Sequence, residues 1–204
     1  MLSQRTIKNK ITCSGVGLHT GKKVKLTFHP AEPNTGILFR RIDGDKVVDI
    51  PATAKNVGET TLSTTLVYGD YKISTIEHLL SALAGTGVDN CIIDCDGPEI
   101  PIMDGSSTQF VFLIQTAGIV EQNAVKKFVY VTKSVQVQRD DAVARIKPYD
   151  GFRVTFTLEF DHPVYNKYPH SASIDFSQTS FIREVSRART FGLMDDFCLL
   201  YTSD

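Results

Sequence analysis

Residues 74–85 read STIEHLLSALAG and mark the point where the hydrophobic period changes from that of strands to that of a helix. Ser74, with Glu77 three residues later, has the form of a capping box, and leucines follow at helical spacing. Gly85 stands where a C-terminal cap is expected. The pattern predicts an amphipathic helix over residues 74–85.

Strands are predicted on both sides of this helix. Apolar and polar residues alternate over 23–28, which indicates a half-buried strand. The apolar run 88–95 predicts another strand, and a second helix is expected from near Ser106 to Gly118. Further strands are expected at 36–42, 47–50, 60–68 and 71–73, the last two joined by a tight turn at Gly69-Asp70.

The second half of the chain shows the same order of elements. A polar stretch at 121–127 reads as a linker, a strongly alternating strand follows at 152–160, and a helix is predicted near 177–188. Strands followed by helices, twice, predict an α+β fold of two similar two-layer domains, with sheets packed on helices. We place the domains at 1–122 and 123–204. The second has one predicted helix where the first has two, so we expect it to be incomplete and the apolar face of its 152–160 strand to be partly uncovered.

Composition narrows the class of protein. The 204 residues carry 22 Lys+Arg and 23 Asp+Glu, and a net charge of -1 argues against a general nucleic-acid binder. No apolar run approaches the ~18–20 residues that span a bilayer, and residues 1–10 have no signal-peptide core. We therefore expect a soluble, cytoplasmic protein.

The four cysteines, at 13, 91, 95 and 198, fit that expectation. Cys91 and Cys95 are four residues apart in a predicted strand, which puts their Cα atoms ~13 Å apart and excludes a disulfide. They are expected to pack as small buried hydrophobes.

The glycine-rich stretch GVGLHTGKK at 15–23 is similar in composition to a phosphate-binding loop. The spacing of its glycines fits neither the Walker pattern nor the dinucleotide-binding pattern. The simpler interpretation is a turn before a strand. His19 in this turn could still reach a substrate, because loop side chains are placed to do so.

Glu77-His78 admits two interpretations. Glu77 could be only the fourth residue of a capping box, with His78 a core histidine. Alternatively, His78 is a metal ligand and the adjacent carboxylate acts as base toward a metal-bound water. A catalytic zinc usually takes three protein ligands, and spacing along this sequence supplies only one.

The stretch RARTFG at 187–192 is also open to two interpretations. Arg187 and Arg189 could be helix-end cations followed by a capping glycine. They could instead hold a phosphate, with the Thr190 hydroxyl donating to an oxyanion.

Six segments, taken together, resemble one family in their order and spacing. They are GVGLHTG (15–21), STIEHL (74–79), ALAG (82–85), DN (89–90), EIPIMDGS (99–106) and SRARTFG (186–192). The family is the UDP-3-O-acyl-N-acetylglucosamine deacetylases, the zinc amidases of lipid A biosynthesis in Gram-negative bacteria. The resemblance covers nearly the whole chain, from about Arg5 to about Asp196.

The resemblance implies a metal-dependent amide hydrolase that removes the N-acetyl group of an acylated UDP-sugar, giving free amine and acetate, with Zn²⁺ as cofactor. It implies that His78 is a zinc ligand on the 74–85 helix, Glu77 the general base, and Thr190 a donor to the tetrahedral oxyanion. The substrate-binding residues that it implies are His19, Leu18, Leu62 and Ser63 (in an insert around 58–73), Phe160 beside the uridine, and Phe191. It also implies that the enzyme meets a membrane surface only transiently, through its acylated substrate.

The resemblance is incomplete at one end. The family takes its other zinc ligands, a His and an Asp four residues apart, from a later helix, and its general acid from a later His. None of these follows in this sequence up to Asp204. We therefore expect a C-terminally truncated chain that is inactive on its own. The alternative is a catalytically inactive fragment that keeps only sugar-nucleotide and acyl-chain binding.

Overall fold

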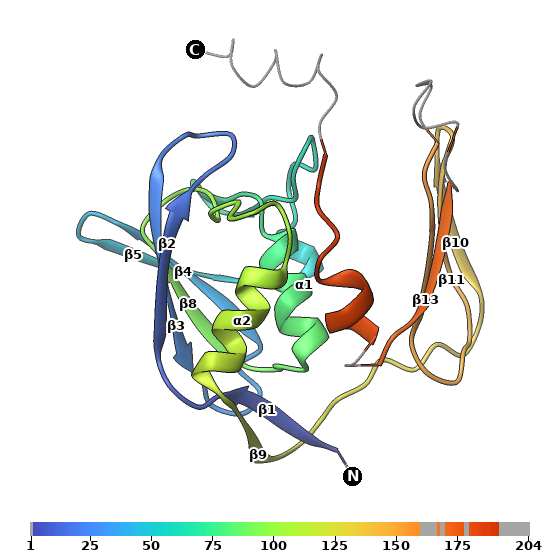
Figure 1. The fold of residues 1–204 in the computed structure, drawn as a ribbon, viewed down its shortest axis with the longest axis horizontal. Coiled ribbons are helices and arrows are strands. Elements are labelled where there is room, and N and C mark those ends of the chain that lie inside the picture. Colours follow the sequence, from blue (N-terminus) through green and yellow to red (C-terminus); the bar gives the residue numbers. More distant parts are fainter. Residues whose placement is uncertain (1, 160–166, 168–169, 178–179, 192–204) are drawn as a thin grey trace. The chain divides into compact units, whose positions relative to one another are not determined.

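The computed structural model describes residues 2–159, 167, 170–177 and 180–191 (Figure 1). Contacts divide the chain into two compact units, one of residues 1–126 with 181–204 and the other of residues 127–180. The first unit carries the larger sheet, both α-helices and most of the residues that the sequence singles out.

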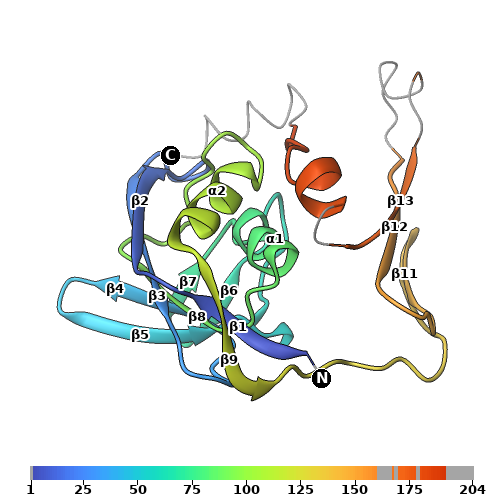
Figure 2. The same cartoon turned by 60° about the horizontal axis from the view of Figure 1, so that its bottom comes forward.

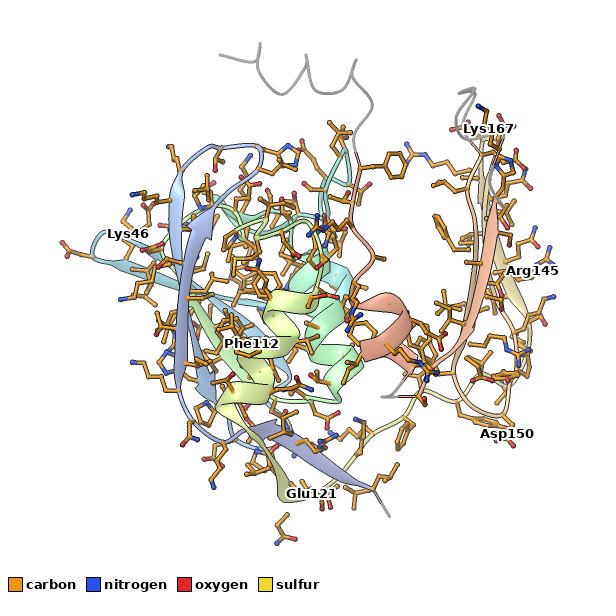
Figure 3. All side chains as sticks on the ribbon, in the orientation of Figure 1. Lys46, Phe112, Glu121, Arg145, Asp150 and Lys167 are labelled. Atoms are coloured by element: carbon orange, nitrogen blue, oxygen red, sulfur yellow. The ribbon has the colours of Figure 1, made fainter. Side chains whose placement is uncertain are left out.

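A five-stranded sheet in the order β2-β3-β8-β4-β5 forms one layer of the first unit. Its strands are β2 (Ile11–Val16), β3 (Lys23–Pro30), β4 (Ile37–Asp43), β5 (Lys46–Pro51) and β8 (Cys91–Cys95). Lys46 marks the outer end of the β4–β5 hairpin (Figure 3). Only the β4–β8 pair is parallel within this sheet. Parallel neighbours need a crossover connection, and the chain between them includes a helix.

That helix, α1 (Glu77–Thr86), and α2 (Thr108–Ala117) cover the same face of the sheet (Figures 1 and 2). The side chains that fill the space between the two layers are at most 1% exposed: Leu79, Leu83, Phe110, Ile114, Phe28, Phe39 and Ile93. The predicted α+β class is confirmed. In the described part of the chain, no helix is long and apolar enough to cross a membrane.

Two short sheets and one helical turn also belong to the first unit. β1 (Ser3–Ile7) pairs with β9 (Ile119–Val125), and β6 (Leu66–Tyr68) pairs with β7 (Tyr71–Ile73). The tight turn predicted between the last two is present, with Gly69 at a φ of 57°. The predicted strand over 60–68 is shorter than expected, because residues 61–63 form a bend before β6. A 3₁₀ turn, η1, spans Ala54–Asn56.

The ends of α1 differ from the sequence prediction. The helix begins at Glu77 rather than at residue 74, and no side chain caps it, so the predicted capping box is wrong. Ser74 lies in a parallel bridge with Glu99 instead, and its hydroxyl accepts a hydrogen bond from Thr65 Oγ1 at 3.0 Å. At the other end, Gly87, with a φ of 78°, is the left-handed cap that was expected at Gly85.

The predicted helix over 177–188 appears as a five-residue π-helix, η3 (Phe181–Val185), and residues 178–179 lie outside the described ones. This segment belongs to the first unit. Phe181 is 3% exposed, and its ring lies so close to Gly85 of α1 that a Cβ on Gly85 would overlap it. Gly85 is therefore a packing position inside α1.

The second unit consists of two hairpins, β10 (Val135–Arg139) with β11 (Ala142–Ile146), and β12 (Arg153–Thr157) with β13 (Ser171–Asp175). The side chains of β12 are all exposed, and the ring of Phe152 beside it lies 5.3 Å from that of Phe176, measured between centroids. The expectation that the apolar face of the 152–160 strand is partly uncovered is confirmed for its described residues.

Substituting Gly85→Ala should destabilise the protein. Alanine raises helix propensity by about 1 kcal/mol relative to glycine, but here the new methyl group overlaps the Phe181 ring. Overpacking of this kind costs about 1–3 kcal/mol, so we expect a net loss in the free energy of unfolding measured with urea.

The matched control is Gly85→Ala combined with Phe181→Ala, which removes the overlapping ring. The combined loss should then be smaller than the sum of the two single losses. Additive losses would show that Phe181 does not pack on Gly85.

Candidate functional site

The His19 turn, residues 17–21, joins β2 to β3. It is closed by backbone hydrogen bonds from Gly21 N to Gly17 O and from Gly17 N to Lys22 O, both 3.0 Å. The turn exposes Leu18, which is 42% accessible. The Nε2 atom of His19 is buried and makes no hydrogen bond with the described residues. The turn thus offers one apolar side chain and one unsatisfied imidazole nitrogen.

The carboxylate of Glu99 anchors this turn from within. Its Oε1 accepts the backbone N–H of His19 at 3.0 Å, and its Oε2 accepts that of Thr20 at 2.9 Å. Oε1 also accepts the hydroxyl of Thr75 at 3.1 Å, and the residue is 1% exposed. Burial alone would raise the pKa of this carboxyl, but the hydrogen bonds from His19, Thr20 and Thr75 lower the pKa below its ordinary value of 4.5.

Glu77 and His78 form the first turn of α1 and are both half-buried. Glu77 Oε2 accepts the backbone N–H of Thr64 at 3.0 Å, and Ile76 N donates to Thr64 O at 3.3 Å. Because both backbone groups of Thr64 are bonded to the start of α1, the carboxylate of Glu77 is held in one orientation. This contact replaces the capping role that the sequence suggested.

The bend before Thr64 carries Leu62 and Ser63. Leu62 has a φ of 56° and is 55% exposed, whereas Ser63 is half-buried. Since Thr64 is bonded to Glu77, the structure brings this bend to the start of α1.

The loop of residues 98–106 connects the remaining candidates. Ile102 N donates to Val16 O at 3.0 Å, which ties the loop to the end of β2. Thr190 N donates to Gly105 O at 2.8 Å, and the Thr190 methyl lies against Gly105. Phe191 follows with 53% of its surface exposed. Thr190 and Phe191 are therefore placed at the same loop as Glu99.

The segment before Thr190 is fixed as well. Thr108 Oγ1 and Ser107 Oγ donate to Ser186 O at 2.8 and 3.2 Å. Arg189 lies 3.5 Å from Asp104, whose pKa is lowered mainly by the hydrogen bond from the Ser106 hydroxyl. The Arg189 side chain is 69% exposed, so this ion pair contributes little to stability.

The structure thus connects Leu18, His19, Glu77, His78, Thr190 and Phe191 to one loop or to its direct neighbours. Phe160 lies outside the described residues, so its position is not part of this arrangement. Glu99, Thr75 and Asp104 were not singled out from the sequence. The only signal was that Glu99 and Asp104 fall in the punctuated stretch EIPIMDGS.

Donors for a metal ion are few among the described residues. No group of three or more His, Cys, Asp or Glu side chains there could hold a metal ion. Burial raises the pKa of the Cys91 thiol to about 12 and those of Cys13 and Cys95 to about 11, so these thiols stay neutral. They are unpaired, as expected for Cys91 and Cys95. The described donors alone do not fit a three-ligand zinc site.

Comparisons with known proteins point to one family. The model of LpxC, described as UDP-3-O-acyl N-acetylglycosamine deacetylase, matches residues 4–203. A UDP-3-O-acyl-N-acetylglucosamine deacetylase of Methylococcus capsulatus is 58% identical over 98% of this chain, and one of Saccharophagus degradans is 58% identical over 96%. One of Coxiella burnetii is 55% identical over 97%. The chain spans 66%, 65% and 65% of the length of these relatives.

Acid should destabilise the protein through Glu99. Its pKa is lowered in the folded state, so the stabilisation is present above about pH 4.5 and is lost as the pH falls through the folded pKa. In Glu99→Gln, the free energy of unfolding should be about 1–3 kcal/mol lower at neutral pH. It should also fall less steeply below about pH 4.5. Urea unfolding across this range measures both effects.

The exposed Glu121 on β9, labelled in Figure 3, provides the control substitution Glu121→Gln. Equal slopes of stability against pH in acid for the wild type and Glu99→Gln would show that these hydrogen bonds do not lower the pKa of Glu99 in the folded protein.

Proposed function

The chain belongs to the LpxC family of UDP-3-O-acyl N-acetylglycosamine deacetylases, and on that premise we propose that the protein removes the N-acetyl group of a UDP-3-O-acyl-N-acetylglucosamine. The products are the free amine and acetate, in a step of lipid A biosynthesis. The observation that carries the proposal is the family match over residues 4–203. Identities of 55–58% to deacetylases support it.

We assign Glu77 as the general base of this hydrolysis. Its carboxylate takes a proton from the attacking water while Thr64 N–H holds it in place. Thr190 is assigned to donate a hydrogen bond from its hydroxyl to the tetrahedral oxyanion. The hydrogen bond from its backbone N–H to Gly105 O fixes its position at the loop. These roles come from the matched motifs, and the observed hydrogen bonds are consistent with them.

A zinc ion is the proposed cofactor, with His78 as one ligand. When bound, such an ion supplies a Lewis acid for the amide carbonyl. Because no three-donor group occurs among the described residues, we propose that the other ligands come from parts of the protein outside them.

We propose that the substrate lies along exposed side chains of the His19 turn, of the bend at residues 61–63 and of residues 190–191. Leu18, Leu62 and Phe191 each expose about half of an apolar surface, which suits an acyl chain. His19 and Ser63 are proposed to lie near the substrate, as the family resemblance implies. Phe160 is proposed to lie beside the uridine, as the family resemblance implies.

We further propose two domains divided at about residue 122, with residues 123–204 belonging to the second. The separate unit of residues 127–180 supports a second domain that starts near this point. Residues 181–204 group with the first unit, and most of the stretch predicted as a linker lies in β9, which ends at Val125. The proposed setting is the cytoplasm of a Gram-negative bacterium, with transient contact to a membrane surface through the acylated substrate. The family resemblance implies this setting.

The catalytic roles can be tested in a version extended to the length of the relatives. Glu77→Gln keeps an oxygen that can accept the Thr64 N–H, so the melting temperature and zinc content should stay near those of the parent. Turnover should fall by ~10²–10⁴-fold, because the base is lost. His78→Ala should lower zinc content and turnover together. Deacetylation rates and metal analysis give the readouts.

Glu77→Ala is the matched structural control, since it removes both the base and the acceptor for Thr64. If Glu77 serves only to hold Thr64, Glu77→Gln will keep more than about a tenth of the parental rate, and the catalytic assignment fails.

The zinc content of the chain can be tested without an activity assay, because its described residues include no group of three donors that could hold a metal ion. We expect the 204-residue chain to bind zinc weakly in equilibrium dialysis, since a single imidazole is a poor site. One tightly held zinc per chain would contradict both this expectation and the assignment of His78 as the single zinc ligand among the described residues.

A further inference from the structure

We propose that Glu99 is a positioning residue that fixes the His19 turn and the start of α1 relative to each other. The inference rests on the proposed function, because that function gives His19, Glu77 and His78 a shared substrate. Glu99 acts through Thr75 and through backbone N–H groups, and it takes no part in bond making or breaking.

Thr75 is the link from Glu99 to α1. Its φ is 58°, in the left-handed region that a β-branched residue rarely adopts. The side chain is 2% exposed, and its hydroxyl donates to Glu99 Oε1 at 3.1 Å. Backbone bonds from Ser74 N to Pro98 O and from Ile100 N to Ser74 O, both 2.9 Å, hold the neighbouring residue. The chain therefore enters α1 from a bend that Glu99 keeps in place.

The same carboxylate holds the His19 turn. The backbone N–H groups of His19 and Thr20 donate to separate oxygens of Glu99, at 3.0 and 2.9 Å. Gly17 lies so close to Oε2 that a Cβ would overlap it. Bonds to a charged acceptor are about twice as strong as neutral ones, so the turn resists any shift away from the carboxylate.

One buried group thus serves two segments that are far apart in the sequence. If the His19 turn moved, Glu99 would have to move with it or leave N–H groups unsatisfied, and Thr75 would lose its acceptor. A change in Thr75 would alter the entry into α1, where Glu77 is bonded to Thr64. The geometry therefore couples the proposed substrate contact of His19 to the orientation of Glu77.

Amide hydrogen exchange on the 204-residue chain tests this coupling without an activity assay. Glu99→Ala removes the acceptor of both segments. We expect the protection of the His19, Thr20 and Thr64 amides to fall by about tenfold more than that of the β8 amides. The matched control Asp94→Ala removes a carboxylate of β8 that accepts from His29 at 2.7 Å, and it should give no selective loss at the three amides.

Substitutions at Thr75 distinguish the effect of Glu99 on the start of α1 from its effect on the His19 turn. Thr75→Val loses only the hydroxyl, so it should lower the protection of Thr64 and leave that of His19 and Thr20 unchanged. Adding Thr75→Gly to Glu99→Ala relieves the strained bend, because glycine adopts positive φ readily. The protection of Thr64 should then recover while that of His19 and Thr20 stays low.

Three results would overturn the proposal: an equal loss of protection at all amides in Glu99→Ala, a Thr64 amide that keeps its protection, or no recovery on adding Thr75→Gly. If Glu99→Ala does not fold, Thr75→Val decides, since unchanged Thr64 protection in that variant contradicts the link through Thr75.

A kinetic readout addresses the role in the proposed reaction. In a version extended to the relatives' length, Glu99→Ala should lower kcat and raise KM, and adding Thr75→Gly should restore kcat but not KM. A change in KM alone would contradict the link to Glu77. An inactive parent enzyme would refute the proposed function, whereas the exchange experiment would still judge the positioning role.

Discussion

The carboxylate of Glu99 is buried, and burial of a charged group without partners is strongly unfavourable. Two backbone N–H groups and a hydroxyl satisfy it, and they come from segments about 80 and 24 residues away. Because an unsatisfied donor would be costly on either side, both segments are held at fixed distances from one point. The position of His19 and the entry into α1 both depend on this condition.

Glycines allow the segments to come this close. Gly15 packs on Pro101 and Met103, Gly17 on Glu99, and Gly85 on Phe181, each at a separation that leaves no room for a Cβ. The glycine-rich stretch at 15–21 is therefore the end of β2 followed by a turn before β3, with close packing at Gly15 and Gly17, and the turn was the interpretation that its spacing favoured over a phosphate loop. The same requirement explains Gly85 in the interior of α1, where a glycine otherwise weakens a helix.

Periodicity predicted what depends on a local pattern. The helices at 77–86 and 108–117 and the hairpin at Gly69 follow from apolar spacing and turn chemistry, and all are present. The capping box failed because Ser74 is used in a bridge to Glu99, a partner 25 residues away that no local rule identifies. Glu99 itself was missed for the same reason. Its donors lie in other segments, and a lone Glu in a loop carries no pattern. The helix predicted near 177–188 is too long, because apolar spacing continues beyond the five residues of η3. The apolar contact of this segment with α1 is made at Phe181.

The contacts of Glu77 bear on the choice between a hydrolase and a binding module. Binding an acyl chain requires exposed apolar side chains, and Leu18, Leu62 and Phe191, which are proposed for this role, are 42%, 55% and 53% exposed. It does not require a half-buried carboxylate beside an imidazole on the first turn of a helix. Nor does it require that Thr64 hold this carboxylate by its backbone N–H. Fixing a carboxylate in one orientation costs conformational entropy, and that cost is understandable where a proton must be taken from a particular place. The arrangement around Glu77 therefore favours the proposed hydrolysis over binding alone.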